Sequence, residues 1–175
     1  NKKGASIMKL TKLTLRNIRS YQNQEITFPK GSILLSGDVG SGKTTILLGI
    51  EYALFGLQPG QRGSSLLTNK EDEGLVILEC EIDDNKVIIE RVLKRSSRGI
   101  NQEYSYITIN GIREELSVTE LKTKILGLLN YPEEFVKKTN LLYRYTVYSP
   151  QEEMKQIILE NEEYRLNILR HVFGI

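Results

Sequence analysis

The chain has 175 residues, and its 24 basic and 22 acidic residues give a net charge of +2. That length suits one domain large enough to bury a core, and the longest apolar runs are far shorter than the roughly 20 residues that cross a bilayer, so no membrane role is expected. A single cysteine, Cys80, excludes a disulfide framework and is expected to be a buried thiol, as in a cytosolic protein.

The first seven residues precede Met8, which looks like a natural initiator, so residues 1–7 are interpreted as a remnant of cloning. Without Lys2 and Lys3 the chain has 22 basic and 22 acidic residues and a net charge of zero. The total charge therefore argues neither for nor against a nucleic-acid partner.

The first half of the chain predicts strands at 8–17 and 25–28, then a strand at 32–36 whose apolar residues do not alternate, as expected of a strand covered on both faces. A helix is predicted from about residue 43 to 55, followed by Gly56 in the place of a C-cap glycine. The helix should present an apolar stripe made of Ile46, Leu47, Ile50 and Leu54. Residues 56–70 are rich in Gly, Ser and Gln and predict a loop.

An antiparallel pattern follows, with strands predicted at 75–82, 86–93 and 104–109. Asp84–Asn85 is the expected turn between the first two strands, 95–99 is an expected loop, and Asn110–Gly111 is a strong hairpin signal. Ser117 and Glu120 form a capping box that opens a helix through about Leu129.

The last part of the chain predicts a short helix after Pro132 and a buried strand over 141–148. A second capping box at 149–152 then opens another helix.

The most specific motif occupies residues 37–44, which read G-D-V-G-S-G-K-T between the predicted strand and helix. This is the phosphate-loop pattern in its expected context. Its glycines let successive backbone N–H groups face a phosphate chain, and the following helix adds its positive end. Lys43 would reach the β- and γ-phosphates, and the Thr44 hydroxyl would bind Mg²⁺.

Hydrolysis also needs an acidic residue at the end of a second buried strand. The nearest candidate, residues 76–79, alternates as a half-exposed strand does and lies before the hairpins, so it is not favoured. The chain is therefore expected to contain half of a nucleotide site.

Three further segments resemble the SMC-type ATPases: the start motif N-I-R-S-Y at 17–21, the helix end I-E-Y-A-L-F-G at 50–56, and Y-S-P-Q at 148–151, where the glutamine loop should lie. Their order resembles the N-terminal lobe of the Rad fifty/SbcC group, the double-strand-break-repair branch of the SMC-like ABC ATPases. The resemblance covers essentially all of 8–175.

The resemblance implies an α/β fold of the P-loop NTPase class, of ABC/SMC-head type, with an antiparallel β subdomain and a C-terminal helix leading to a coiled coil. Residues 8–160 would form the ATPase lobe and 161–175 the root of a truncated coiled coil. In this family the acidic strand and signature motif lie in a separate C-terminal lobe.

The same resemblance implies the roles of individual residues. Lys43 and Gln151 would be catalytic, and Thr44 and Gln151 would approach Mg²⁺. The residues implied to contact ATP are Arg19, Gly37, Asp38, Val39, Gly40, Ser41, Gly42, Lys43, Thr44, Thr45, Thr68, Asn69 and Lys70. Val39 departs from the asparagine usual in the family, but binding through backbone N–H groups should survive.

The implied function is an ATP-driven head of an intracellular, cytoplasmic or nucleoid-associated DNA-repair machine, inactive without its C-terminal lobe. Its implied partners are that lobe, a second head in a homodimer, DNA and a nuclease. Candidate DNA contacts are the basic residues Lys94, Arg95, Arg98, Lys122 and Lys124. The alternatives are a chromosome-organising SMC-type ATPase without a nuclease and the nucleotide-binding subunit of a transporter.

Overall fold

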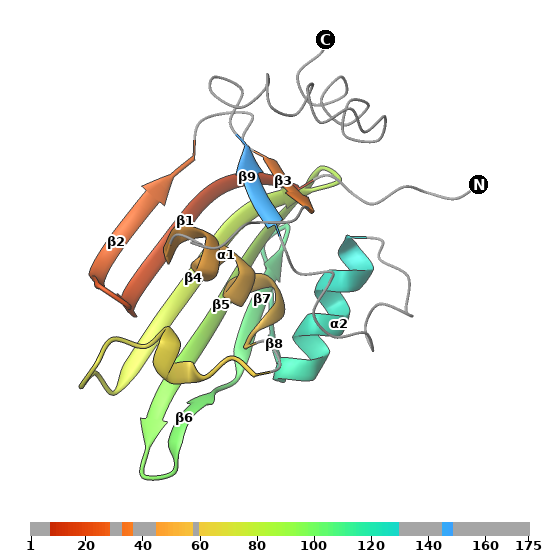
Figure 1. The fold of residues 1–175 in the computed structure, drawn as a ribbon. Helices are drawn as coiled ribbons and strands as arrows, with labels where there is room; N and C mark the ends of the chain where they lie inside the picture. The colour runs from red at the N-terminus through yellow and green to blue at the C-terminus, as the bar shows by residue number, and fades with distance from the viewer. Residues whose placement is uncertain (1–7, 29–32, 37–44, 58–59, 130–144, 149–175) are drawn as a thin grey trace.

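The computed structural model of the chain describes residues 8–28, 33–36, 45–57, 60–129 and 145–148. Within them, nine strands form one sheet in the order β8-β7-β5-β4-β1-β3-β9, with β2 paired to β1 and β6 paired to β5 (Figure 1). The strands are β1 Met8–Ile18, β2 Tyr21–Thr27, β3 Ile33–Ser36, β4 Glu73–Ile82, β5 Asn85–Ser96, β6 Gly99–Gln102, β7 Ser105–Ile109, β8 Ile112–Leu116 and β9 Tyr145–Tyr148. The pairings described between these strands are all antiparallel.

Two α-helices cover one face of this sheet (Figure 1). Helix α1, Thr45–Phe55, packs over β1, β4 and β5, and α2, Val118–Leu128, packs over β7 and β8. Burial along β4 alternates as predicted, because the side chains between Gly74 and Ile82 point in turn toward and away from the helices. The predicted apolar stripe of α1 is too narrow, since every residue from 50 to 55 is buried.

The core also contains the lone thiol. Cys80 is 3% exposed, on the face of β4 that the helices cover. Burial raises the pKa of this thiol to about 12, so it remains protonated at neutral pH. The prediction of a buried thiol is confirmed.

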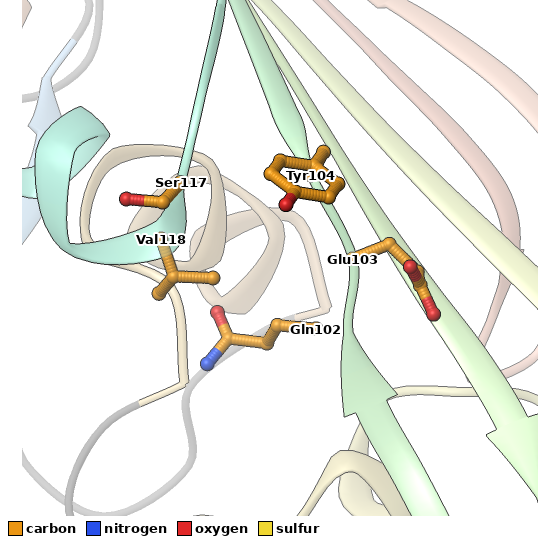
Figure 2. A pocket seen from close by; sticks show the side chains of 5 residues that line it. All are labelled: Gln102, Glu103, Tyr104, Ser117 and Val118. Carbon is orange, nitrogen blue, oxygen red and sulfur yellow. The ribbon is translucent and has the colours of Figure 1, made fainter.

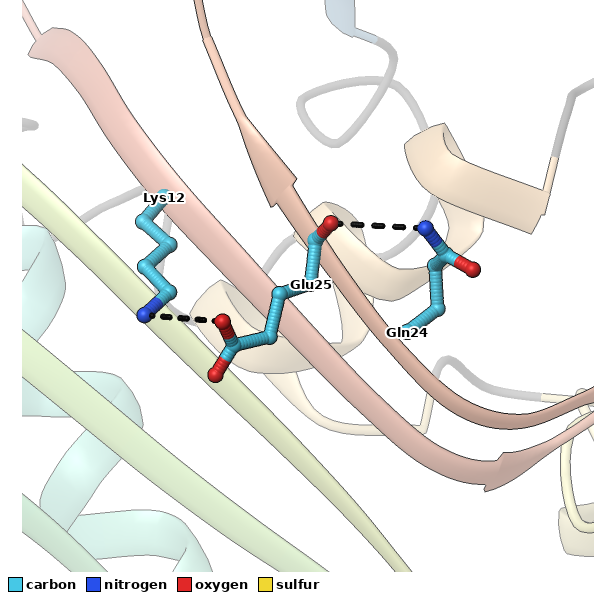
Figure 3. A network of polar contacts seen from close by, with 3 residues as sticks. All are labelled: Lys12, Gln24 and Glu25. Carbon is cyan, nitrogen blue, oxygen red and sulfur yellow. Dashed lines mark hydrogen bonds and ion pairs between the residues drawn. The ribbon is translucent and has the colours of Figure 1, made fainter.

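Strand β1 connects the different parts of the sheet. It pairs with β4 along most of its length, with β3 through Met8 and Lys9, and with β2 from Lys12 to Ile18. The register against β4 shifts between Leu10 and Lys12, which marks a bulge where the neighbour changes from β3 to β2. Figure 3 shows the adjoining polar contacts: Lys12 pairs with Glu25 at 3.3 Å, and the Gln24 amide donates to the Glu25 carbonyl at 3.4 Å.

Two of the two-residue hairpins, β4–β5 and β7–β8, are closed by turns with positive φ at both central residues. The predicted turn at Asn110–Gly111 is confirmed, with φ of 49° and 87°. The prediction for the β4–β5 turn is wrong by one residue: Asp83 and Asp84 form it, with φ of 47° and 65°, and Asn85 already pairs with Ile82. Short polar side chains such as aspartate tolerate this left-handed conformation.

Two segments predicted as loops contain more structure. Residues 95–99 close a hairpin between β5 and β6, in which Ser96 pairs with Gly99. Residues 56–70 include a 3-10 helix, η1, at Gly63–Ser65 and two buried leucines, Leu66 and Leu67. The first segment is ordered by pairing between β5 and β6, and the second is joined to the end of β1 by a bridge between Leu67 and Ile18. Local composition does not indicate either contact.

The predicted helix ends are confirmed where the structure describes them. Ser117 caps α2 by accepting from the Glu120 N–H at 3.3 Å. Gly56 follows α1 with φ of 73°, and its N–H donates to the Tyr52 carbonyl at 2.8 Å. The last predicted strand is described at Tyr145–Tyr148. The short helix after Pro132, the helix from Ser149 and the coiled-coil root at 161–175 lie outside the described residues.

No helix in the described part of the chain combines the length and the apolar character needed to cross a membrane.

Candidate nucleotide site

The described residues frame the phosphate-loop sequence on both sides. β3 ends at Ser36 and α1 begins at Thr45, so residues 37–44 connect a sheet strand directly to a helix N-terminus. The loop residues Gly37–Thr44 and the predicted glutamine Gln151 lie outside the described residues. Of the other predicted contacts, the structure places Thr45, Arg19 and Thr68–Lys70.

The N-terminal end of α1 is suited to an anion. Its first turn contains no acidic residue, and Thr45 is half-buried. The unpaired N–H groups at a helix start carry partial positive charge, which an acidic side chain would otherwise neutralise. This end of the helix therefore fits a phosphate group.

Arg19 lies in a strained turn, which we call the Arg19 turn (residues 17–21). Asn17 and Arg19 both have φ of 51°, in the left-handed region that residues other than glycine rarely adopt. Such strain persists only where surrounding contacts hold it. The Arg19 side chain is exposed, so the turn presents a guanidinium to solvent.

The contacts that hold the Arg19 turn come from the segment just after η1. The Arg19 N–H donates to the Leu66 carbonyl at 2.6 Å, and the Thr68 N–H donates to the Asn17 carbonyl at 3.0 Å. The Thr68 hydroxyl donates to the Arg19 carbonyl at 2.6 Å. Two segments predicted to approach the nucleotide, 49 residues apart in sequence, are thus joined directly.

A glycine completes this arrangement. The Asn17 side-chain amide donates to the Glu73 carbonyl at 3.0 Å, which brings the turn against the start of β4. A Cβ on the next residue, Gly74, would lie 3.1 Å from the Asn17 carbonyl oxygen and 2.8 Å from a Leu67 methyl group. Glycine therefore permits the close approach of β4 to the turn.

Sequence reasoning missed the residue at the opposite end of α1. Arg91, on β5, is 1% exposed, and its guanidinium donates from Nε to the Ala53 carbonyl at 2.7 Å and from Nη2 to the Leu54 carbonyl at 3.0 Å. Burial lowers its pKa to about 10, so it remains charged at neutral pH. Its burial could have been predicted from the alternation along β5, because Arg91 occupies the same side of the strand as the buried residues Val87, Ile89 and Leu93.

Nearby polar groups secure the same helix end. The Tyr52 hydroxyl donates to the Val92 carbonyl at 3.3 Å, and burial raises the pKa of that hydroxyl. The Leu57 N–H donates to the Gln102 side-chain oxygen at 3.1 Å. The last turn of α1 has no basic residue of its own, so Arg91 supplies the cation that a helix C-terminus favours.

The acidic residue considered for catalysis does not face α1. Glu79 is half-exposed and alternates with the buried residues Leu78 and Cys80, which point toward the helices. It therefore lies on the opposite face of the sheet from α1. This placement agrees with the sequence argument against residues 76–79 as the catalytic strand.

The candidate DNA contacts are surface residues on two different elements. Lys94, Arg95 and Arg98 are exposed at the β5–β6 hairpin, where the Arg95 Nε donates to the Glu71 carbonyl at 3.0 Å. Lys124 on α2 lies 3.7 Å from a Glu114 carboxylate oxygen. These geometries provide cations at the surface but no arrangement specific to a nucleic acid.

A shallow pocket of about 220 Å³ opens where the chain passes from β6 to β7 beside the start of α2 (Figure 2). It is lined by Gln102, Glu103, Tyr104, Ser117 and Val118. None of these residues was predicted as a site residue, and the pocket is separate from the residues that frame the phosphate loop.

A strand, a phosphate-loop sequence and a helix beside an antiparallel sheet define the class of P-loop ATPase lobes. Comparison with known families agrees, because residues 12–171 match the model of the AAA domain family. The chain belongs to that family.

Individual relatives were found as well. The DNA double-strand break repair Rad50 ATPase of Aeropyrum pernix is 33% identical over 141 residues, which cover 76% of this chain and 15% of that protein. The corresponding ATPase of Methanococcus maripaludis is 27% identical over 173 residues, covering 96% of this chain and 16% of that protein. A solved structure of the recombination mediator RecF-ATP has a TM-score of 0.47 and 23% identity, covering 69% of this chain and 31% of that one.

The chain thus spans about one sixth of the length of these two ATPases. The relatives confirm the resemblance to the N-terminal lobe of an SMC-like ATPase head of the Rad fifty/SbcC branch, and the predicted fold class with it.

Proposed function

We propose that this chain is the ATP-binding N-terminal lobe of an intracellular DNA double-strand break repair ATPase. The observation that carries the proposal is the position of residues 37–44, which join the end of β3 to the first residue of α1. A phosphate-loop sequence at such a junction has one well-understood use, the binding of a nucleotide's phosphates. The repair function follows the printed names of the relatives.

Within the loop, backbone N–H groups from Gly37 to Thr45 would face the phosphates, and Lys43 would provide a positive charge beside the β- and γ-phosphates. The Thr44 hydroxyl and the Gln151 side chain would hold Mg²⁺, which neutralises phosphate charge when bound. The absence of acidic residues from the first turn of α1 favours this use.

Arg19 would contact a phosphate from outside the loop. Its turn is held rigidly by the segment from Leu66 to Thr68, and its guanidinium is exposed. A planar guanidinium is well suited to bidentate contact with phosphate oxygens. Asn69 and Lys70 follow Thr68 and are proposed to lie near the same nucleotide.

Turnover would require parts from other chains or lobes. None of the described acidic residues meets the requirement at the end of a second buried strand, and Glu79 faces away from α1. We therefore propose that a C-terminal lobe and a second head in a homodimer complete the site, and that ATP-driven pairing of the heads controls DNA binding and a nuclease partner. The chain without its C-terminal lobe would bind ATP weakly and release almost no phosphate.

Titration of the intact protein with ATP and Mg²⁺ tests the proposal. Lys43→Ala should weaken ATP binding by roughly ten- to hundredfold, the effect of losing a charge-assisted contact of about 1.5–3 kcal/mol. Lys86→Ala, at an exposed lysine on β5, is the matched control and should bind normally. An intact protein that binds no ATP would refute the proposal.

Two further outcomes separate the repair reading from its alternatives. Co-purification with a nuclease supports the repair function, whereas co-purification with a linker protein that bridges two heads supports a chromosome-organising ATPase. Phosphate release by residues 8–175 alone would contradict the proposed division of the site between two lobes.

A further inference from the structure

Arg91 is the most deeply buried charged residue in the described part of the chain. Its guanidinium binds the C-terminal end of α1. Its Nε and Nη2 donate to two successive carbonyls, those of Ala53 and Leu54, at 2.7 and 3.0 Å. Among the described residues its Nη1 has no hydrogen-bond partner. A cation in this environment is expensive to bury, so its presence calls for a specific use.

The surroundings are shaped to admit this guanidinium. Gly56, the residue after α1, has φ of 73°, and a Cβ there would lie 3.2 Å from Nη1 and 2.5 Å from the Gln102 side-chain oxygen. A larger residue at position 56 would therefore crowd both groups. Two adjacent carbonyls suit the planar fork of arginine, which lysine cannot reproduce with its single ammonium group.

The opposite end of the same helix leads into the phosphate loop. α1 has 11 residues and starts at Thr45, directly after Thr44. At 1.5 Å per residue it is about 16 Å long, and a helix this short moves as a rigid rod. A displacement of its C-terminal end would therefore be passed on to the residues that start the helix.

The strand on the other side of the loop has few pairings with β1 among the described residues. In the described residues, β3 pairs with β1 at only two positions, Met8 with Leu34 and Lys9 with Ile33, and its other neighbour is the short strand β9. In the described residues, α1 therefore provides a second connection between the end of the loop sequence and the antiparallel strands, through its packing on β1, β4 and β5.

We infer that Arg91 is a positioning residue for the phosphate loop. By binding the end of α1 from β5, it fixes the position of the helix. The start of the helix in turn fixes where the loop meets the nucleotide. The inference rests on the nucleotide binding proposed above. Arg91 does not touch the nucleotide in this account, and it acts through the Ala53 and Leu54 carbonyls. Arg91 would then couple the antiparallel sheet to the nucleotide site, together with the packing of α1 on β1, β4 and β5.

The test compares Arg91→Met and Arg91→Lys with core variants of equal stability. Ile107→Val and Ile107→Ala provide the controls, because Ile107 is fully buried on β7, where α2 packs. Urea unfolding of all the variants identifies the Ile107 variant whose unfolding midpoint matches that of each Arg91 variant. ATP affinity with Mg²⁺ is then measured on the intact protein well below those midpoints, together with the ³¹P resonance of the bound β-phosphate.

Arg91→Met should bind ATP about tenfold more weakly than its matched control, as found when a supporting contact behind a binding group is lost. Its bound β-phosphate resonance should also shift, whereas the control leaves the resonance in place. Equal affinities and unchanged resonances would assign Arg91 a purely stabilising role and overturn the inference.

Should Arg91→Met fail to fold, Arg91→Lys carries the same comparison, since lysine retains the positive charge but loses the two-pronged contact. Absence of ATP binding by the unmodified protein would instead refute the proposed function itself, and this inference with it.

Discussion

Thr68→Val is the sharpest single test of the Arg19 turn, because it replaces a hydroxyl with a methyl group of similar size. The variant removes the 2.6 Å hydrogen bond to the Arg19 carbonyl and leaves the backbone contacts of Leu66 and Thr68 in place. Any change in the turn can then be assigned to one interaction.

The magnitude follows from the contacts of the turn. Two residues with φ of 51°, Asn17 and Arg19, cost about 1 kcal/mol each or somewhat more. Four hydrogen bonds oppose this strain, at about 1 kcal/mol each. Losing one of them should lower the free energy of local opening by about 1 kcal/mol, which corresponds to roughly a fivefold larger open population.

Amide hydrogen exchange measures this opening directly. The Arg19 and Thr68 N–H groups both donate within the turn, so both should exchange about fivefold faster in the variant. Thr123→Val is the matched control, since it also deletes a threonine hydroxyl bond, 3.0 Å to the Thr119 carbonyl on α2. Unchanged exchange in Thr68→Val, or equal acceleration by Thr123→Val, would refute the reasoning.

The remaining predictions concern the stability of other elements. Gly63→Ala should lower the free energy of unfolding by about 1–3 kcal/mol in urea titrations, because its Cβ would lie 2.5 Å from an Ile100 methyl group. Gly127→Ala, with open space on α2, should raise the free energy of unfolding by about 0.5–1 kcal/mol. A gain in stability for both variants would contradict the contact at Gly63. Ser117→Ala should cost about 1 kcal/mol and speed exchange in the first turn of α2, and unchanged exchange would argue against the cap. Cys80 should react with a disulfide reagent at pH 8 only through unfolding, and rapid labelling of the folded protein would contradict its burial. Because its pKa is raised from 9.0 to about 12, the folded state holds the proton more tightly, so stability should fall as the pH rises from about 9 toward 12, and Cys80→Ala should flatten that fall.

The sequence predicted most accurately the features that depend only on residues close together in the chain. Alternation along residues 75–82, the Asn110–Gly111 turn and the Ser117 cap each depend on a few neighbouring residues, and all three are confirmed. The phosphate loop is of the same kind, because glycine spacing, a lysine and a hydroxyl within eight residues suffice to identify it. β6 was missed because its four residues are mostly polar and owe their extended form to pairing with β5.

Contacts between distant segments could not be predicted in this way. Nothing in the residues around Thr68 indicates that its hydroxyl meets the Arg19 carbonyl, since that contact depends on how η1 packs beside the end of β1. Arg91 illustrates a second limit. A charged residue is ordinarily expected at the surface, and the helix end that accepts this one comes from a different part of the chain.

The seam between β1 and β3 has a mechanical consequence. In the described residues, β1 is joined to β4 by eight residue pairs but to β3 by two. In the part of the chain that the structure describes, β9 pairs with β3, and β3 meets the other antiparallel strands through these two pairs with β1. The proposed nucleotide-binding junction follows β3, so a force that separates β3 from β1 would displace this junction before the eight pairs between β1 and β4 break.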